Sequence, residues 1–211
     1  MSAVGGIVLA YLAGSFPSAF LAGRVWGVDL SKVGSGNYGA TNVYRNLGKG
    51  PALVVLVFDV AKGFLPVWFL PRWFAGGVEP STYAVVLGVA AVAGHVYSIF
   101  LAFKGGKGIG TAAGVFLALA PLAAGLAAVV WFAVVGWRRV VSLASLCAAL
   151  VLLIAVWVLY AGGLPTSWPL VALTTFLTAF VFWTHRENIG RLKRGEEKQI
   201  RPSGPTGAGS T

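Results

Sequence analysis

The sequence predicts an all-α integral membrane protein, a bundle of about seven transmembrane helices of which two are short. Hydrophobic residues make up 57% of the 211-residue chain and charged residues only 10%, with a mean hydropathy of +0.82. Soluble domains carry about 25% charged residues, so this chain lacks the polar side chains that would cover a globule. Apolar runs of about 20 residues, the length that crosses a bilayer, recur along it.

Apolar segments long enough for membrane-spanning helices cover most of the chain. They are residues 4–23, 51–70, 83–103, 111–137, 140–160 and 167–184. Pro17 predicts a kink in the first segment and Pro121 interrupts the fourth, because proline lacks the N–H that a helix interior uses. We expect a single transmembrane catalytic domain over residues 1–201 and a flexible tail over 202–211, where small polar residues dominate.

Three polar stretches separate these segments: DLSKVGSGNYGATNVYRNLGKG at 29–50, KGGKGIGT at 104–111 and HRENIGRLKRGEEKQI at 185–200. Basic loops favour the cytosolic side of a membrane. If residues 111–137 formed one span, Arg138, Arg139 and the third stretch would lie outside. A hairpin of two short helices broken at Pro121 brings them to the cytosolic side with the first two stretches. We therefore expect the N-terminus outside and the C-terminus in the cytosol.

The first polar stretch combines glycines with short hydrogen-bonding side chains and an arginine. Gly36 permits close backbone approach, Ser35, Asn37 and Thr41 add short donors, and the fork of Arg45 suits phosphate. The alternative is an ordinary membrane loop made of turn residues. GSGNYG also fits the dinucleotide pattern G-x-G-x-x-G, but it follows a transmembrane segment rather than a strand, so we reject that interpretation.

The second polar stretch repeats glycine and lysine at the start of an apolar segment. The N–H groups of Gly105, Gly106 and Gly108, beside Lys104 and Lys107 at a helix N-terminus, predict a phosphate site. The spacing is not that of a Walker A motif. The alternative is a tight turn between two helices. The formal charge of +10 does not indicate nucleic acid as a partner, because the basic residues lie between apolar segments.

Five further ionisable or polar residues complete the candidates. His185 titrates near neutral pH and follows an apolar segment, and Asn188 shares its helix face three residues later. Asp59 and Lys62 lie three apart inside an apolar segment, which predicts a structural ion pair that lies too deep to complete a triad with Ser35. His95 lies inside another segment, where we expect a hydrogen-bonded core histidine.

Together the three stretches resemble the PlsY-type acyl-phosphate:glycerol-3-phosphate acyltransferases of bacterial membranes. The resemblance covers SGNYGATNVYR, GHVYSIFLAFKGGKGIGT and HRENIGRLKRGEE, and extends to YLAGSFPSA and FDVAKG. It implies transfer of a fatty acyl group from acyl phosphate to the 1-hydroxyl of sn-glycerol 3-phosphate, giving lysophosphatidic acid and phosphate. It also implies a site on the cytosolic side of the bacterial inner membrane, next to membrane lipid, with no metal, no cofactor, and neither acyl-CoA nor acyl carrier protein as donor.

The resemblance implies roles for individual residues. Ser35 and Arg45 belong to the first motif, the glycines of the second form a glycerol-phosphate site, and His185 and Asn188 belong to the third. Glu197 matches a glutamate with a structural role. The enzyme that forms acyl phosphate in the same pathway is a candidate partner.

Two other classes compete with an acyltransferase. A transporter or channel for phosphorylated metabolites would suit glycine-rich basic loops, but it should show internal repeats and a site near the midplane. A non-catalytic scaffold for anionic lipids would not need Ser35 or His185. For an acyltransferase three routes stay open: a covalent Ser35 intermediate, direct transfer with His185 as base, and direct transfer in which the acyl phosphate's own oxygen takes the proton.

Overall fold

A computed structural model describes residues 2–200, and helices account for all the regular secondary structure in that range. The tail predicted at 202–211 therefore lies outside the described residues. In chain order the helices are α1 (Ala3–Ser15), α2 (Ser18–Val25), α3 (Ala40–Leu47), α4 (Lys49–Phe69), α5 (Pro71–Phe74), α6 (Pro80–Val96), the 3₁₀ turn η1 (Ile99–Leu101), α7 (Ile109–Leu119), α8 (Pro121–Arg138), α9 (Val141–Ala161), α10 (Trp168–Thr184) and α11 (Arg186–Lys193).

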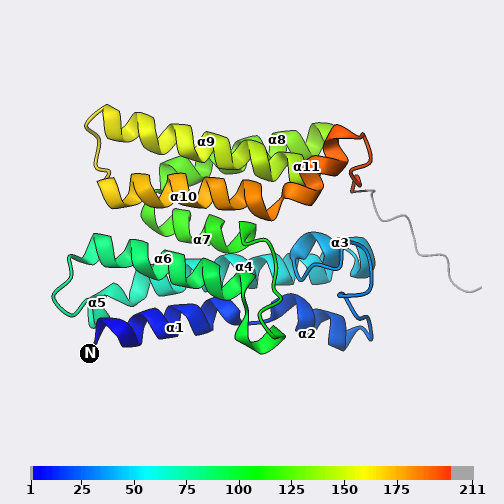
Figure 1. Ribbon diagram of the computed structural model, residues 1–211, viewed down its shortest axis with the longest axis horizontal. Coiled ribbons are helices and arrows are strands. Elements are labelled where there is room, and N and C mark those ends of the chain that lie inside the picture. The colour runs from blue at the N-terminus through cyan, green and yellow to red at the C-terminus, as the bar shows by residue number, and fades with distance from the viewer. Residues whose placement is uncertain (1, 201–211) are drawn as a thin grey trace, which may run out of the picture.

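The long helices run side by side in one bundle, with α7 between two groups (Figure 1). One group holds α1, α4 and α6, and the other holds α8, α9 and α10; α7 contacts members of both. The N-terminus lies at one end of the bundle, while α3 and α11 lie at the opposite end. The three polar stretches thus meet at the end away from the N-terminus, as the parity of the segments predicts.

Within the described range, five stretches are long and apolar enough to cross a membrane: Ala3–Val25, Lys49–Phe74, Pro80–Leu101, Pro121–Arg138 and Val141–Ala161. A sixth arises if α10 and α11, bent by 59°, count as one span. Large apolar side chains such as Trp137 and Phe132 point outward on these helices, which suits a lipid-facing surface. The predicted all-α membrane fold is confirmed; the orientation of the termini across a membrane stays a prediction.

The break at Pro121 is present, but its two helices differ in length. Helix α7 has 11 residues, about 16 Å at 1.5 Å per residue, and is too short to cross about 30 Å of hydrocarbon. Helix α8 begins at Pro121, whose missing N–H costs nothing at a helix start, and continues for 18 residues. The hairpin therefore pairs one short helix with one of nearly full length.

Pro17 breaks the first segment into α1 and α2, and side chains from distant parts of the chain donate to the carbonyl groups at the break. Ser98 Oγ donates to the Ser15 carbonyl at 2.6 Å, and Lys62 Nζ donates to the Phe16 carbonyl at 3.0 Å. A buried lysine inside α4 is thus explained in part by a broken helix beside it, because carbonyl groups at membrane depth need internal donors.

Candidate active site

All three polar stretches line one cavity of about 480 Å³ at the end of the bundle that holds α3 and α11. Its lining includes these predicted site residues: Ser35, Asn37, Thr41, Arg45, Lys107, Gly108, His185, Asn188, Glu197 and Asp59. Segments as far apart in the sequence as those of Ser35 and Ile200 therefore supply one site, which a set of unrelated basic loops would not do.

A hydrogen-bonded chain links the second and third stretches across the cavity. Lys107 Nζ donates to Asn188 Oδ1, and Asn188 Nδ2 donates to Glu197 Oε1 at 2.6 Å. Burial lowers the pKa of Lys107 to about 8, and the nearby Glu197 carboxylate opposes that shift. Lys107 therefore keeps its charge at neutral pH and loses it above about pH 8. It is held by an amide that is itself oriented by a carboxylate.

Glu197 ties α11 to α9 through three donors. Besides Asn188, Ser142 Oγ donates to Oε1 at 2.9 Å and Arg191 Nε donates to Oε2 at 2.7 Å. Burial raises the pKa of the Glu197 carboxyl, but hydrogen bonds from Arg191, Asn188 and Ser142 outweigh burial and leave the pKa below its ordinary value. The side chain is only 4% exposed, so these bonds form out of water, where they are stronger.

His185 sits at the bend between α10 and α11 and is 3% exposed. Its Nδ1 lies 2.8 Å from the Val181 carbonyl oxygen. A carbonyl only accepts, so this contact places the proton of a neutral ring on Nδ1 and leaves Nε2 with a free lone pair. Nε2 is therefore the atom of this ring that can take a proton from a substrate. The expectation that His185 titrates near neutral pH is wrong, because burial, and secondly the charge of Lys107, lower its pKa to about 4.

Asn42 shapes the loop that presents Ser35. The Ser35 N–H donates to Asn42 Oδ1 at 3.0 Å, and Asn42 Nδ2 donates to the Leu30 and Val33 carbonyls at 3.0 and 3.2 Å. Gly34 has φ +64°, and a Cβ there would collide with Asn42 Oδ1, so glycine is required. Asn42 is 1% exposed and acts inside the loop rather than as a free donor.

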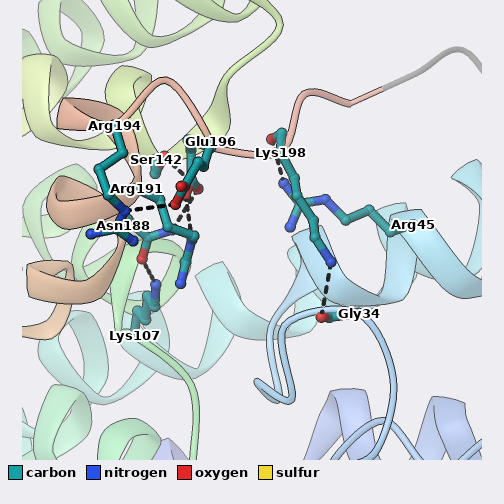
Figure 2. Close-up of polar contacts among 10 residues, drawn as sticks. Gly34, Arg45, Lys107, Ser142, Asn188, Arg191, Arg194, Glu196 and Lys198 are labelled. Carbon is teal, nitrogen blue, oxygen red and sulfur yellow. Dashed lines mark hydrogen bonds and ion pairs between the residues drawn. The ribbon is translucent and has the colours of Figure 1, made fainter.

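Residues 196–200, here called the strap, cross from α11 to the first polar stretch (Figure 2). The Lys198 carbonyl accepts from Arg45 Nη2 at 2.8 Å, and Lys198 Nζ lies 3.5 Å from the Gly34 carbonyl. The Ile200 N–H donates to the Arg139 carbonyl at 2.8 Å. Arg45 Nε is buried and has no partner among the described residues.

The other predicted residues lie apart from this lining. Lys104 is exposed, Gly36 is absent from the lining and has φ +67°, and Gly105 and Gly106 pack on His95. A Cβ on Gly106 would collide with His95 Nε2, and one on Gly105 would collide with the His95 carbonyl oxygen. These two glycines therefore allow close packing of the loop, and their role in binding phosphate stays a prediction.

Asp59 and Lys62 form the ion pair that their spacing predicts, with Lys62 Nζ 2.8 Å from Asp59 Oδ1. The expectation of a hydrogen-bonded core histidine at His95 is wrong, because its Nδ1 is buried without a partner and the residue lines the cavity. The reason is the close fit of His95 to Gly106, which fixes the ring 3.7 Å from Asp59 Oδ1, beyond hydrogen-bond range.

Sequence reasoning missed several lining residues. Lys49 begins α4 and adds a third cation to Arg45 and Lys107, and Trp131, Ser142 and Ser145 come from α8 and α9. Lys49 lies at the end of the first polar stretch, and this position in the sequence indicates that it belongs to the same basic group as Arg45. The contribution of α8 and α9 depends on packing between distant helices and leaves no local signal.

Comparison with known proteins decides the family. Residues 4–195 match the family described as Glycerol-3-phosphate acyltransferase. The chain belongs to this family. Glycerol-3-phosphate acyltransferases of Anaeromyxobacter sp. (strain Fw109-5) and of Thermus thermophilus are 43% and 45% identical to it, over 92% and 94% of this chain and 95% and 96% of theirs.

Solved structures agree with that assignment. A crystal structure of PlsY (YgiH), an integral membrane glycerol 3-phosphate acyltransferase, in its glycerol 3-phosphate form aligns with a TM-score of 0.84 at 38% identity, covering 94% of this chain and 96% of that one. The lysophosphatidic acid form aligns with a TM-score of 0.82 at 37% identity, covering 94% and 95%. The resemblance to PlsY-type enzymes is therefore confirmed, and the chain is an acyltransferase by family.

Within residues 2–200, no group of three or more His, Cys, Asp or Glu side chains is placed to hold a metal ion. The acyltransferase cavity instead offers three cations, a histidine with a free Nε2 and the short side chains of the first stretch. This set of groups suits anionic substrates and proton transfer.

Proposed function

We propose that this family member transfers a fatty acyl group from acyl phosphate to the 1-hydroxyl of sn-glycerol 3-phosphate, giving lysophosphatidic acid and inorganic phosphate. The carrying observation is one cavity that joins Arg45, Lys49 and Lys107 to an apolar wall of Leu53, Leu56 and Trp131. Both substrates carry phosphate and one carries a lipid chain. Leu53 is 63% exposed on the bundle surface, so an acyl chain can reach the cavity from lipid.

Each substrate has a matching set of groups. Arginine binds phosphate through paired donors, whereas lysine acts as a point charge, and two phosphates need more than one cation. The glycerol 3-phosphate and lysophosphatidic acid forms of the related PlsY structures support the same acceptor and product here. The basic loops support a cavity on the cytosolic side of the bacterial inner membrane, where a soluble enzyme that forms acyl phosphate could deliver the donor.

The reaction is a direct acyl transfer. The 1-hydroxyl oxygen forms a bond to the acyl carbonyl carbon, the bond from that carbon to the phosphate oxygen breaks, and phosphate leaves. The hydroxyl proton goes to His185 Nε2 or to an oxygen of the departing phosphate. Ser35 and Asn188 hold substrate oxygens, and Lys107 and Arg45 stabilise the phosphate charge. No hydrogen bond joins Ser35 to His185 in the described chain, which favours direct transfer over a Ser35 nucleophile.

The test uses purified protein in lipid vesicles with palmitoyl phosphate and glycerol 3-phosphate. Phosphate release and lysophosphatidic acid, measured by mass spectrometry, should rise in equal amounts, and palmitoyl-CoA should give no product. Product from palmitoyl-CoA but not from palmitoyl phosphate would overturn the donor assignment. Uptake of glycerol 3-phosphate into vesicles without acylation would favour a transporter.

The proton acceptor is tested separately with His185→Gln. General-base catalysis contributes about 10²–10⁴-fold, so loss on that scale, together with loss of the acidic limb of the pH–rate profile, identifies His185 as base. Survival of the acidic limb in the residual activity identifies the substrate phosphate instead. An acyl-Ser35 adduct that acylates glycerol 3-phosphate would replace both direct routes.

A further inference from the structure

The inner end of the cavity carries two buried ionisable side chains that the proposed reaction leaves without a role. Asp59 on α4 and His95 on α6 both line the cavity and are 3% and 5% exposed. Asp59 follows Lys49, the first residue of α4, by ten residues, about 15 Å of helix. Ionisable groups at such depth in a membrane protein are costly and mark function more often than not.

The hydrogen bonds of Asp59 satisfy only one of its oxygens. Ser18 Oγ donates to Oδ1 at 2.7 Å, and Lys62 Nζ lies 2.8 Å from the same oxygen. His95 Nδ1 also faces Oδ1, but at 3.7 Å. Among residues 2–200, nothing donates to Asp59 Oδ2, so this carboxylate has an acceptor to spare on the cavity wall.

The contacts of His95 leave Nδ1 as its spare polar atom. Its Nε2 edge lies against Gly106, where even a methyl group would collide, and the Gly106 N–H donates to the His95 carbonyl at 3.2 Å. Nδ1 is buried and unpartnered on the side that faces Asp59. A buried donor without a partner is unfavourable unless a ligand supplies one.

We propose that Asp59 and His95 form a hydroxyl-binding subsite that takes the 2-hydroxyl of glycerol 3-phosphate; the assignment of the hydroxyl rests on the proposed function. A hydroxyl can donate to Asp59 Oδ2 and accept from His95 Nδ1–H at once. A phosphate group would be repelled by the carboxylate, and Arg45, Lys49 and Lys107 offer it a better site. The 1-hydroxyl must meet the acyl donor beside His185, so the 2-hydroxyl is the group left to bind here.

The subsite makes the enzyme selective for glycerol 3-phosphate over 1,3-propanediol monophosphate, which keeps the phosphate and the reacting hydroxyl but lacks the 2-hydroxyl. Calorimetry should give a Kd for the wild-type protein that is about 10- to 100-fold lower for glycerol 3-phosphate, as expected for a hydrogen bond to a charged group. His95→Leu should reduce this preference to about twofold or less. His95→Asn, whose amide nitrogen can stand where Nδ1 stands, should keep most of it.

The outcomes separate selectivity from structure. Equal affinity of the wild-type protein for the two ligands would refute the subsite, and this measurement needs no variant. Equal loss of both affinities in a folded His95→Leu variant would also refute it, because that pattern is expected if His95 only positions the Gly106 loop. Binding is measured without acyl donor, so failure of acyl transfer would count against the proposed function and leave the Kd ratio to judge the subsite.

Discussion

Glu197 should be the side chain on which the shape of the site depends most. Its carboxylate holds Asn188, Arg191 and Ser142 at 2.6, 2.7 and 2.9 Å and is 4% exposed. Hydrogen bonds to charged groups contribute about 1.5–3 kcal/mol each, but bonds that share one carboxylate are not additive. Glu197→Ala should therefore destabilise the protein by about 3–5 kcal/mol, the range for removing one partner of a buried charged network.

The matched control is Glu196→Ala, one residue away. Glu196 pairs with Arg194 at 2.7 Å, but the two side chains are 57% and 60% exposed, and such pairs contribute about 0–1 kcal/mol. A change of 1 kcal/mol shifts Tm by about 2–4 °C at this size, so Glu197→Ala should lower the Tm by about 6–20 °C in detergent and Glu196→Ala by about 4 °C or less. Phosphate release should also fall in the Glu197 variant, because Asn188 loses the group that orients it. Equal Tm values for the two variants would refute the reasoning.

Three further predictions follow from single contacts. Because burial holds the pKa of Lys107 near 8, the charged form is lost above that pH, and the KM for glycerol 3-phosphate should rise there by up to about tenfold per pH unit. Lys107→Arg should move this rise in KM to higher pH. If the rise stays at the same pH in the variant, a group other than Lys107 causes it. Gly106→Ala must displace His95 and should lower both Tm and activity, whereas Gly50→Ala, with open space around its Cβ position, should change neither; equal effects would contradict the packing role. Single cysteines at Arg139 and Gly163 in a cysteine-free background should react with impermeant thiol reagents from opposite sides of the membrane. Labelling of both positions from the same side would refute the predicted topology.

Much of the fold could be predicted because lipid imposes simple rules. Apolar runs of about 20 residues become helices, and a proline inside a run marks a break, as Pro17 and Pro121 do. The basic stretches gather at one end because each pair of spans returns the chain to the side it left. The lengths of α7 and α8 were less predictable, since the start of α7 depends on how the second polar stretch folds against α6 rather than on apolar content.

The candidate site was predictable in its chemistry but not in its contacts. Ser35, Arg45, Lys107, His185 and Asn188 line the cavity as expected. Lys104 and Lys107 look equivalent in the sequence, yet the left-handed residues 102 and 103 turn the chain so that only Lys107 faces Asn188. The contacts of Asn42 and Lys198 could not be predicted, because they are hydrogen bonds to backbone groups in neighbouring turns or with side chains far away in the sequence.

The buried charges of α4 connect the two themes of fold and chemistry. The Phe16 carbonyl beside Pro17 accepts from the Ser18 N–H and from Lys62 Nζ, and Asp59 pairs with Lys62. The ion pair of Lys62 and Asp59 satisfies both charges, since an unpaired ionised group at membrane depth is unfavourable. Beside this pair, no described residue donates to Asp59 Oδ2, and His95 Nδ1 is buried without a partner among the described residues. A structural explanation alone accounts for Lys62 and leaves those two atoms without partners, whereas a bound hydroxyl accounts for both.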